Sequence, residues 1–216
     1  MLDFPYIIKN SSRAKGLRIV INSRGEVVLT KPKFVPNFIA KQFLLSKQKW
    51  VLDSLDKISQ KSISKDQIFY RGKLYQLDFK QGKSKIIIKH PKIFIYSPEK
   101  NIGLRQLTYF LKKQAEIKIL DSLVKNSQRM QLEYRQVRFR DQKTRWGSCS
   151  SQKNLNFNWR LIMSPPEVLD YVVIHELAHL KHHDHSKAFW QLVENFDPDY
   201  REHRRWLNRN QQNLIF

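Results

Sequence analysis

One stretch, residues 164–179, constrains the fold more than any other part of the sequence. It opens with Ser-Pro-Pro-Glu, in which Ser164 is placed to cap a helix and Glu167 completes a capping box. We therefore expect a helix that begins at Pro165. Most of the residues that follow are apolar, which predicts that this helix is buried. The apolar residues are Val168, Leu169, Val172, Val173, Ile174 and Leu177.

The same helix carries three polar side chains, His175, Glu176 and His179. Residues four apart lie on one face of a helix, so both imidazoles can face one ion. Glu176 is rotated by about 100° from His175, which places its carboxylate better for a water on the ion than for the ion itself. This is the H-E-x-x-H arrangement of zinc hydrolases. Polar groups on a buried helix need partners, and a metal ion supplies them.

The third ligand of such an ion is sought among the other nearby histidines. A catalytic zinc usually takes three protein ligands and leaves one position open for water. If the helix continued, His182 would lie about 10 Å from His175 along its axis, too far for ligands that converge on one tetrahedral ion. A ligand placed after a turn of the chain fits better. The candidates are His182, His183, His185 and His203.

His185 meets that condition, because its neighbours Asp184 and Ser186 are typical of turns and helix caps. The spacing of the three histidines is then H-x3-H-x5-H. An acidic residue further along the chain, Glu194 or Glu202, is the alternative third ligand.

The rest of the chain predicts an α+β protein whose N-terminal region is rich in strands. Pro98 and Gly103 interrupt the pattern and mark a soft boundary. We therefore expect a basic, β-rich region over residues 1–100 with one amphipathic helix, and a second domain over residues 101–216. The expected strands fall within 17–30, 67–96, 136–140 and 155–163, and the other helices within 36–58 and 104–130.

The net charge of +21 favours anionic partners and is unevenly distributed. Residues 1–100 hold 21 Lys and Arg against 7 Asp and Glu, whereas residues 101–216 hold 19 against 12. Such a field attracts polyanions, so nucleic acid bound through the basic N-terminal half is one expectation. A chain that is merely rich in solvated lysine gives the same sum, and no dense Lys/Arg run or nucleic-acid motif is present.

The composition and the first residues predict a cytoplasmic protein. The single cysteine, Cys149, excludes an internal disulfide and fits a reducing compartment. The N-terminal residues lack the basic-then-apolar pattern of a signal peptide. The longest apolar runs are far too short to span a membrane, so no membrane partner is expected.

Four segments together resemble one known family. TRWGSCS, NFNWRLIMSPPEVLDYVV, HELAH and HHDHSKAFW closely resemble the YgjP-like (DUF45) metal-dependent hydrolases, which are related to the SprT-like and Wss1-like metallopeptidases. The close match runs from Arg138 to Trp206, and the β-rich N-terminal part is similar in layout. The resemblance implies a zincin-like catalytic domain with an active-site helix. It also implies that Zn²⁺ is held by His175, His179 and His185, and that Glu176 is catalytic.

Three functions fit this site. The first is a zinc-dependent, metallopeptidase-like hydrolase in which Glu176 is the general base for a metal-activated water. The second is a metal-dependent hydrolase of nucleotide phosphoanhydrides, a nucleoside triphosphate pyrophosphatase, whose anionic substrate would suit the surplus lysines. The third is a non-enzymatic nucleic-acid-binding module with a structural zinc, although structural sites are normally closed by four protein ligands. The expected partner is therefore a peptide, protein or nucleotide substrate.

Several residues near the motif are candidates for the substrate cleft. The strand expected over residues 155–163, or the strand before it, is a candidate to pair with an extended substrate. Asn158 and Trp159 are then expected to line the cleft, with burial in the core as the favoured alternative for Trp159. The candidate donors to a developing oxyanion are Tyr134, Arg145 and His203.

Overall fold

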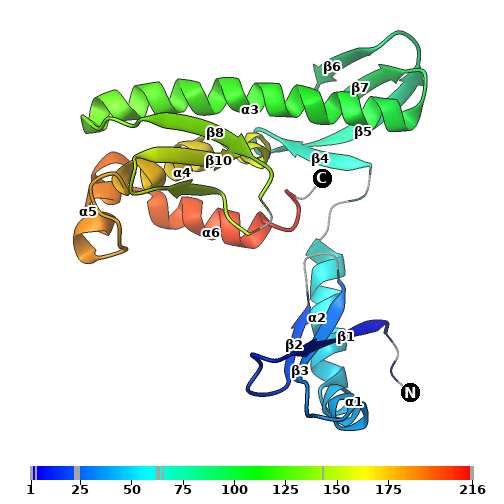
Figure 1. The fold of residues 1–216 in the computed structure, drawn as a ribbon. Helices are drawn as coiled ribbons and strands as arrows, with labels where there is room; N and C mark the ends of the chain where they lie inside the picture. The colour runs from blue at the N-terminus through cyan, green and yellow to red at the C-terminus, as the bar shows by residue number, and fades with distance from the viewer. Residues whose placement is uncertain are drawn as a thin grey trace. The chain divides into compact units, whose positions relative to one another are not determined.

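The computed structural model describes residues 2, 4–21, 25–61, 64, 66–142 and 144–214, without the side chains of residues 57–61. The chain forms two compact units, residues 1–62 and 63–216 (Figure 1). The division expected between residues 100 and 101 lies inside the second unit, at the start of a long helix. Gly103 does not interrupt this helix. It lets the helix pack closely on the preceding strand, because a Cβ there would lie 2.9 Å from Ile95 Cγ2.

The first unit is a three-stranded sheet followed by two helices. The strand order is β1-β3-β2, with β1 parallel and β2 antiparallel to the central β3. The single helix expected over 36–58 is instead two helices, because the first ends at Lys47, where φ is −107°. Ser23 and Arg24 of the expected hairpin turn lie outside the described residues. The bounds are β1 Tyr6–Ser11, β2 Arg18–Ile21, β3 Val27–Pro32, α1 Asn37–Ser46 and α2 Gln48–Lys61.

Alternating burial in β3 directs this unit's core to one face of the sheet. Val27 and Leu29 are buried, whereas Val28 and Thr30 between them are partly exposed. The remaining core residues come from both helices and from the start of the chain, and are Phe4, Ala40, Leu44 and Val51.

The second unit begins with a four-stranded sheet of order β4-β5-β7-β6, which confirms the strands expected over 67–96. A 31-residue helix, α3, follows and runs past both sheets of this unit (Figure 1). A second sheet of order β8-β10-β9 comes after α3. The bounds are β4 Gln67–Tyr70, β5 Lys73–Gln81, β6 Lys85–Lys89, β7 Lys92–Ser97, α3 Lys100–Met130, β8 Gln136–Arg140, β9 Gly147–Cys149 and β10 Asn154–Asn158.

The remaining elements are helical. The strand expected over 155–163 is half correct, since β10 gives way to a 3-10 helix, η1. The predicted capping box is wrong. The Ser164 hydroxyl donates to the Leu161 carbonyl at the end of η1, so α4 begins one residue later than expected, without a side-chain cap. The bounds are η1 Trp159–Met163, α4 Pro166–Ala178, α5 Lys187–Phe196 and α6 Tyr200–Asn210.

Helix α4 is buried, as the sequence predicts, because α3, α5 and α6 all pack against it. Its apolar residues join one large core with side chains of α3 such as Leu111 and Ile119. Helix α4 is therefore held rigidly, and so are the polar residues near its C-terminal end. Among the described residues, no helix is both long enough and apolar enough to cross a membrane.

Candidate metal centre

The end of α4 and the turn after it bring three histidines together. His175 lies in the last turn of α4, and His179 is its C-cap. The chain then turns, and Ser186 caps α5 by accepting a hydrogen bond from the Phe189 amide. This turn, expected from the sequence, places His185 opposite the end of α4. One nitrogen of each of the three rings lies within 4.8 Å of the others.

The donor set fits a metal ion. The Nε2 atoms of His175 and His185 lie 3.3 Å apart. Two nitrogens bound to one tetrahedral zinc are separated by about 3.3 Å, given Zn–N bonds of about 2.05 Å. Nδ1 of His179 lies 3.0 Å from the His182 carbonyl oxygen, which can only accept. Nδ1 therefore carries the proton, and Nε2 keeps a lone pair for a metal.

Burial keeps His175 in the form that binds metals. Burial, together with the charges of the neighbouring His179 and His185, lowers the pKa of His175 to about 3. Burial also lowers the pKa of His179. Both rings are therefore neutral near pH 7, so a metal ion would not have to displace a proton from either. Nδ1 of His175 is buried without a hydrogen-bond partner in the protein. Such an unsatisfied buried group lowers the stability of the fold, which is typical of a functional site.

Glu176 is a buried carboxyl group next to this cluster. It is 5% exposed, and burial raises its pKa to about 8, while the charge of Arg145 acts in the opposite direction. The described residues offer it no hydrogen bond, although all seven other buried polar side chains found among them have side-chain hydrogen bonds within their own unit. A carboxyl group with this environment can accept a proton near neutral pH.

Strand β9 packs directly against Glu176. A Cβ at Gly147 would lie 2.5 Å from Oε1 and 2.6 Å from Cγ of Glu176, so only glycine fits here without displacing the carboxyl group. The sheet order places β9 at an edge, paired on one side with β10. Residues 155–158, expected as the open strand, instead pair on both sides, with β8 and with β9. The backbone of β9 is therefore the open edge nearest to Glu176.

The side chain of Asn158 fixes the loop that precedes β9. It is 2% exposed, and its amide donates to the carbonyl oxygens of Gln142 (2.6 Å) and Arg145 (3.2 Å). Asn158 therefore positions the loop and does not line a cleft. Trp159 is 3% exposed and belongs to the core, which was the favoured alternative.

Aromatic rings surround the histidines. Phe189 is fully buried, and its ring centroid lies 4.5 to 4.9 Å from those of His175, His179 and His185. Trp190 stacks on His185 with centroids 5.5 Å apart. These contacts pack the start of α5 against the histidine-bearing end of α4. They also fix the ring orientations, as a preorganised metal site requires.

The other candidate ligands do not join the cluster found among the described residues. Glu194 lies 3.5 Å from Arg201, and Glu202 lies 3.4 Å from Arg205, both as exposed pairs. His182 contributes its carbonyl oxygen to the hydrogen bond with His179.

Two of the three candidate oxyanion donors, Arg145 and His203, lie near other residues of the site. Arg145 lies close enough to Glu176 to affect its pKa. His203 places Nδ1 2.9 Å from Asp197 Oδ2, and its ring lies 6.4 Å from that of Tyr171. Tyr134 packs against the hydrophobic core.

Tyr171 and Gly147 were missed in the sequence. Tyr171 lies one turn before His175, its ring centroid is 5.9 Å from that of His175, and burial raises its pKa to about 12. Its i, i+4 relation to His175 was the available signal. The role of Gly147 had no such signal, because it depends on a contact between distant parts of the chain.

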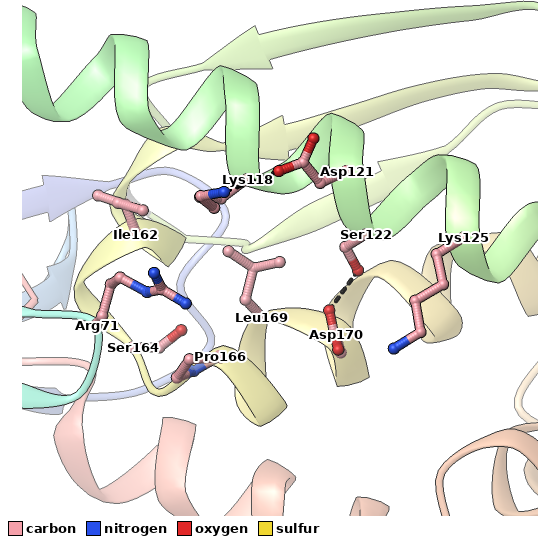
Figure 2. A pocket seen from close by; sticks show the side chains of 10 residues that line it. All are labelled: Arg71, Lys118, Asp121, Ser122, Lys125, Ile162, Ser164, Pro166, Leu169 and Asp170. Carbon is pink, nitrogen blue, oxygen red and sulfur yellow. Dashed lines mark hydrogen bonds and ion pairs between the residues drawn. The ribbon is translucent and has the colours of Figure 1, made fainter.

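A separate pocket of about 250 Å³ lies between α3 and the start of α4 (Figure 2). Its charged groups are partly paired. Lys118 lies 2.9 Å from Asp121, and the Ser122 hydroxyl donates to Asp170. None of the histidines lines it, so it is distinct from the metal centre.

Comparison with known proteins agrees with this geometry. The model of the YgjP-like metallopeptidase domain matches residues 15–210. A UTP pyrophosphatase of Escherichia coli (strain K12) is 42% identical over 50 residues, which are 21% of this chain and 30% of that relative. The match therefore spans less than a third of the relative's length. No solved structure matches the chain. Because the family model covers most of the chain, the protein belongs to the YgjP-like family, which is described by its metallopeptidase domain.

Proposed function

We propose that the protein is a zinc-dependent hydrolase in which His175, His179 and His185 hold the ion and Glu176 is the general base. Zinc held by these residues would lower the pKa of a coordinated water to about 7 and would polarise the oxygen of the attacked group. Three histidines leave a fourth position open, as in catalytic sites. The observation that carries the proposal is the buried Glu176 carboxyl group, without a protein hydrogen bond, beside three converging imidazoles.

Glu176 accepts the proton of the attacking water and passes it to the leaving group. In the metal-free protein burial raises its pKa to about 8, and a base with a pKa near the working pH can take up and release a proton readily. Arg145, whose charge reaches Glu176, is the donor best placed to stabilise negative charge on the substrate. The third interpretation, a structural zinc in a nucleic-acid-binding module, leaves this buried carboxyl group without a role.

A peptide bond is one candidate substrate, as the family's description suggests. The open edge of β9 favours it, because an extended peptide can add to a sheet edge through main-chain hydrogen bonds. A nucleotide phosphoanhydride is the second candidate, favoured by the name of the Escherichia coli relative.

Two assays with one variant test the proposal. Metal-loaded wild type is expected to hydrolyse either casein or nucleoside triphosphates. Glu176→Gln is expected to abolish that hydrolysis while it keeps the metal. Hydrolysis that survives Glu176→Gln would contradict the role of Glu176. Salt-sensitive nucleic-acid binding unaffected by Glu176→Gln, without hydrolysis, would favour the structural-zinc interpretation instead.

A further inference from the structure

The pocket between α3 and the start of α4 takes no part in the proposed hydrolysis, and three cations line it. Arg71 comes from the turn between β4 and β5, and Lys118 and Lys125 come from α3. Burial raises the pKa of Tyr70, and the charges of Arg71 and Lys118 both act against this rise, so the two cations face one region. Lys118 pairs with Asp121 at 2.9 Å. Among the described residues, Arg71 and Lys125 have neither an ion pair nor a side-chain hydrogen bond, so both charges are open to a ligand.

The backbone holds Arg71 at this pocket in an unfavourable conformation. Arg71 and Gly72 form the two-residue turn of a β-hairpin, and both have positive φ, 50° and 76°. Such type I′ turns favour Asn, Asp or Gly at the first position, because most other side chains are strained there. The turn is also fixed in place, since its two amides donate to the carbonyl oxygens of Ile162 and Met163. Arginine therefore costs this turn stability, as expected of a residue whose side chain has another role.

The rest of the pocket combines a fixed polar end with an apolar floor. Ser122 is 5% exposed, and its hydroxyl donates to Asp170, which orients that carboxylate. In Figure 2, Leu169 lies between Asp170 and Arg71. Leu169 and Ile162 line the pocket and are almost fully buried, so they form its apolar floor. An apolar surface with a few convergent polar groups is typical of a site for a small molecule.

We propose that this pocket binds a small carboxylate that carries an apolar carbon chain. The three cations stand against two carboxylates, Asp121 and Asp170, and leave one positive charge, which matches a monoanion better than a phosphate dianion. The planar guanidinium of Arg71 matches the two oxygens of a carboxylate. The volume of about 250 Å³ lies below the range of about 300–1,000 Å³ for drug-sized ligands, so the ligand is small. This binding site is independent of the metal centre and of the proposed hydrolysis.

Two sources can supply such a carboxylate, a free organic acid or the C-terminus of a peptide. 4-Methylpentanoate represents the first and N-acetylleucine the second, whereas N-acetylleucinamide keeps the leucine side chain without the charge. Two-dimensional NMR titration of the full-length protein gives the affinity and the location of each ligand. We expect an acid to bind with a dissociation constant on the order of 1 mM, to shift amides within residues 162–170, and to bind at least about ten-fold more tightly than the neutral amide. The acid that binds more tightly identifies the source.

Arg71→Asn is the most informative variant, because asparagine suits the conformation of the turn. It should weaken binding of the acid about ten-fold, as loss of a charged hydrogen bond does, while the melting temperature stays equal or rises. Lys125→Gln should weaken binding about three-fold, since its exposed charge contributes less. The matched control is Lys113→Gln, an exposed lysine of α3 that does not line the pocket, which should change binding less than about two-fold.

Several results would overturn the inference. The acids bind no more tightly than N-acetylleucinamide, or Arg71→Asn binds them with wild-type affinity. The shifts are confined to residues 175–185, so that the acids bind at the metal centre alone. Inorganic phosphate displaces the acids at a lower concentration than their own, which would reject the carboxylate class. None of these results affects the proposed hydrolase, which is tested separately at Glu176.

Discussion

The two units of the chain treat buried polar groups differently. In the first unit, the buried polar side chain among the described residues is Lys31, whose ammonium donates to the Val35 carbonyl oxygen at 2.6 Å. The second unit also buries hydrogen-bonded side chains such as Asn126 and Asn158. In the described part of that unit, the Glu176 carboxyl group has no protein hydrogen bond, and His175 Nδ1 is one of six buried side-chain atoms without a hydrogen-bond partner.

This difference in hydrogen bonding distinguishes buried polar residues that stabilise the fold from buried polar residues that reduce its stability. A satisfied buried group such as Lys31 contributes to a closed core, whereas an unsatisfied one costs about 1–3 kcal/mol. The second unit can tolerate this cost because α4 is embedded in a much larger apolar core. The comparison therefore indicates where stability has been exchanged for chemistry.

The largest expected effect is on catalysis, and it compares a buried polar residue of the second unit with one of the first. Glu176→Gln should lower kcat by a factor of about 10²–10⁴, because the general base is lost while the ligands remain. Lys31→Met, at the buried polar site of the first unit, should leave kcat within about two-fold, since the histidine cluster and Glu176 all belong to the second unit. Steady-state hydrolysis of casein or of nucleoside triphosphates, whichever the metal-loaded wild type cleaves, measures both. Equal losses in the two variants would break the comparison.

Two core substitutions compare the units directly. Leu29→Ala and Leu177→Ala each remove a fully buried side chain, one from each unit, and should each cost about 2–5 kcal/mol of unfolding free energy. Only Leu177→Ala should also weaken metal binding, because Leu177 lies in α4 between the two helical ligands. Denaturant unfolding and metal titration of both variants provide the measurements. Weaker metal binding in Leu29→Ala would show that the first unit supports the site.

The stability of the metal-free protein should depend on pH through Glu176. Its pKa is about 8 in the folded chain and 4.5 ordinarily. Between these values the unfolded chain has lost a proton that the folded chain keeps, so the contribution of Glu176 to stability falls as pH rises through this window, whereas the lowered pKa of His175 acts in the opposite direction below pH 6.5. Glu176→Gln removes this loss, and its advantage over wild type should grow from pH 5 to pH 8, to on the order of a few kcal/mol. Thermal melts with chelator across this range test it, and a constant difference would contradict the burial of a protonated Glu176.

The smallest expected effect concerns the contact between β9 and Glu176. Gly147→Ala places a Cβ 2.5 Å from Oε1, so the carboxyl group must shift. We expect about a ten-fold loss of kcat with metal content unchanged, since small misplacements of catalytic groups are costly. Gly16→Ala is the matched control, because a Cβ there meets nothing within 4 Å. Full activity in Gly147→Ala would show that Glu176 does not need this position.

Local patterns in the sequence predicted much of the site. The i, i+4 spacing of His175 and His179 and the turn residues around His185 were sufficient to anticipate three converging imidazoles. The same local logic predicted the four strands over 67–96 and the long helix α3. These features depend on periodicity and turn chemistry, which a single sequence carries.

Features that depend on contacts between distant segments could not be predicted in this way. The sequence pattern at Ser164 is that of a helix cap, but its hydroxyl instead donates to the Leu161 carbonyl oxygen in η1. Gly103 has the composition of a break, yet it allows α3 to approach β7. In the sequence Gly147 is an ordinary loop glycine, and only the packing of β9 against Glu176 gives it a role. In each case a tertiary contact decides between locally equivalent possibilities.

The most direct measurement is the metal content of purified wild type beside His175→Ala, His185→Ala and Glu202→Ala. The structure predicts about one zinc ion per chain in wild type and in Glu202→Ala, and little or none in either histidine variant. A wild-type protein that cannot be loaded with zinc, or a His185→Ala variant that keeps its zinc while Glu202→Ala loses it, would contradict the three-histidine centre.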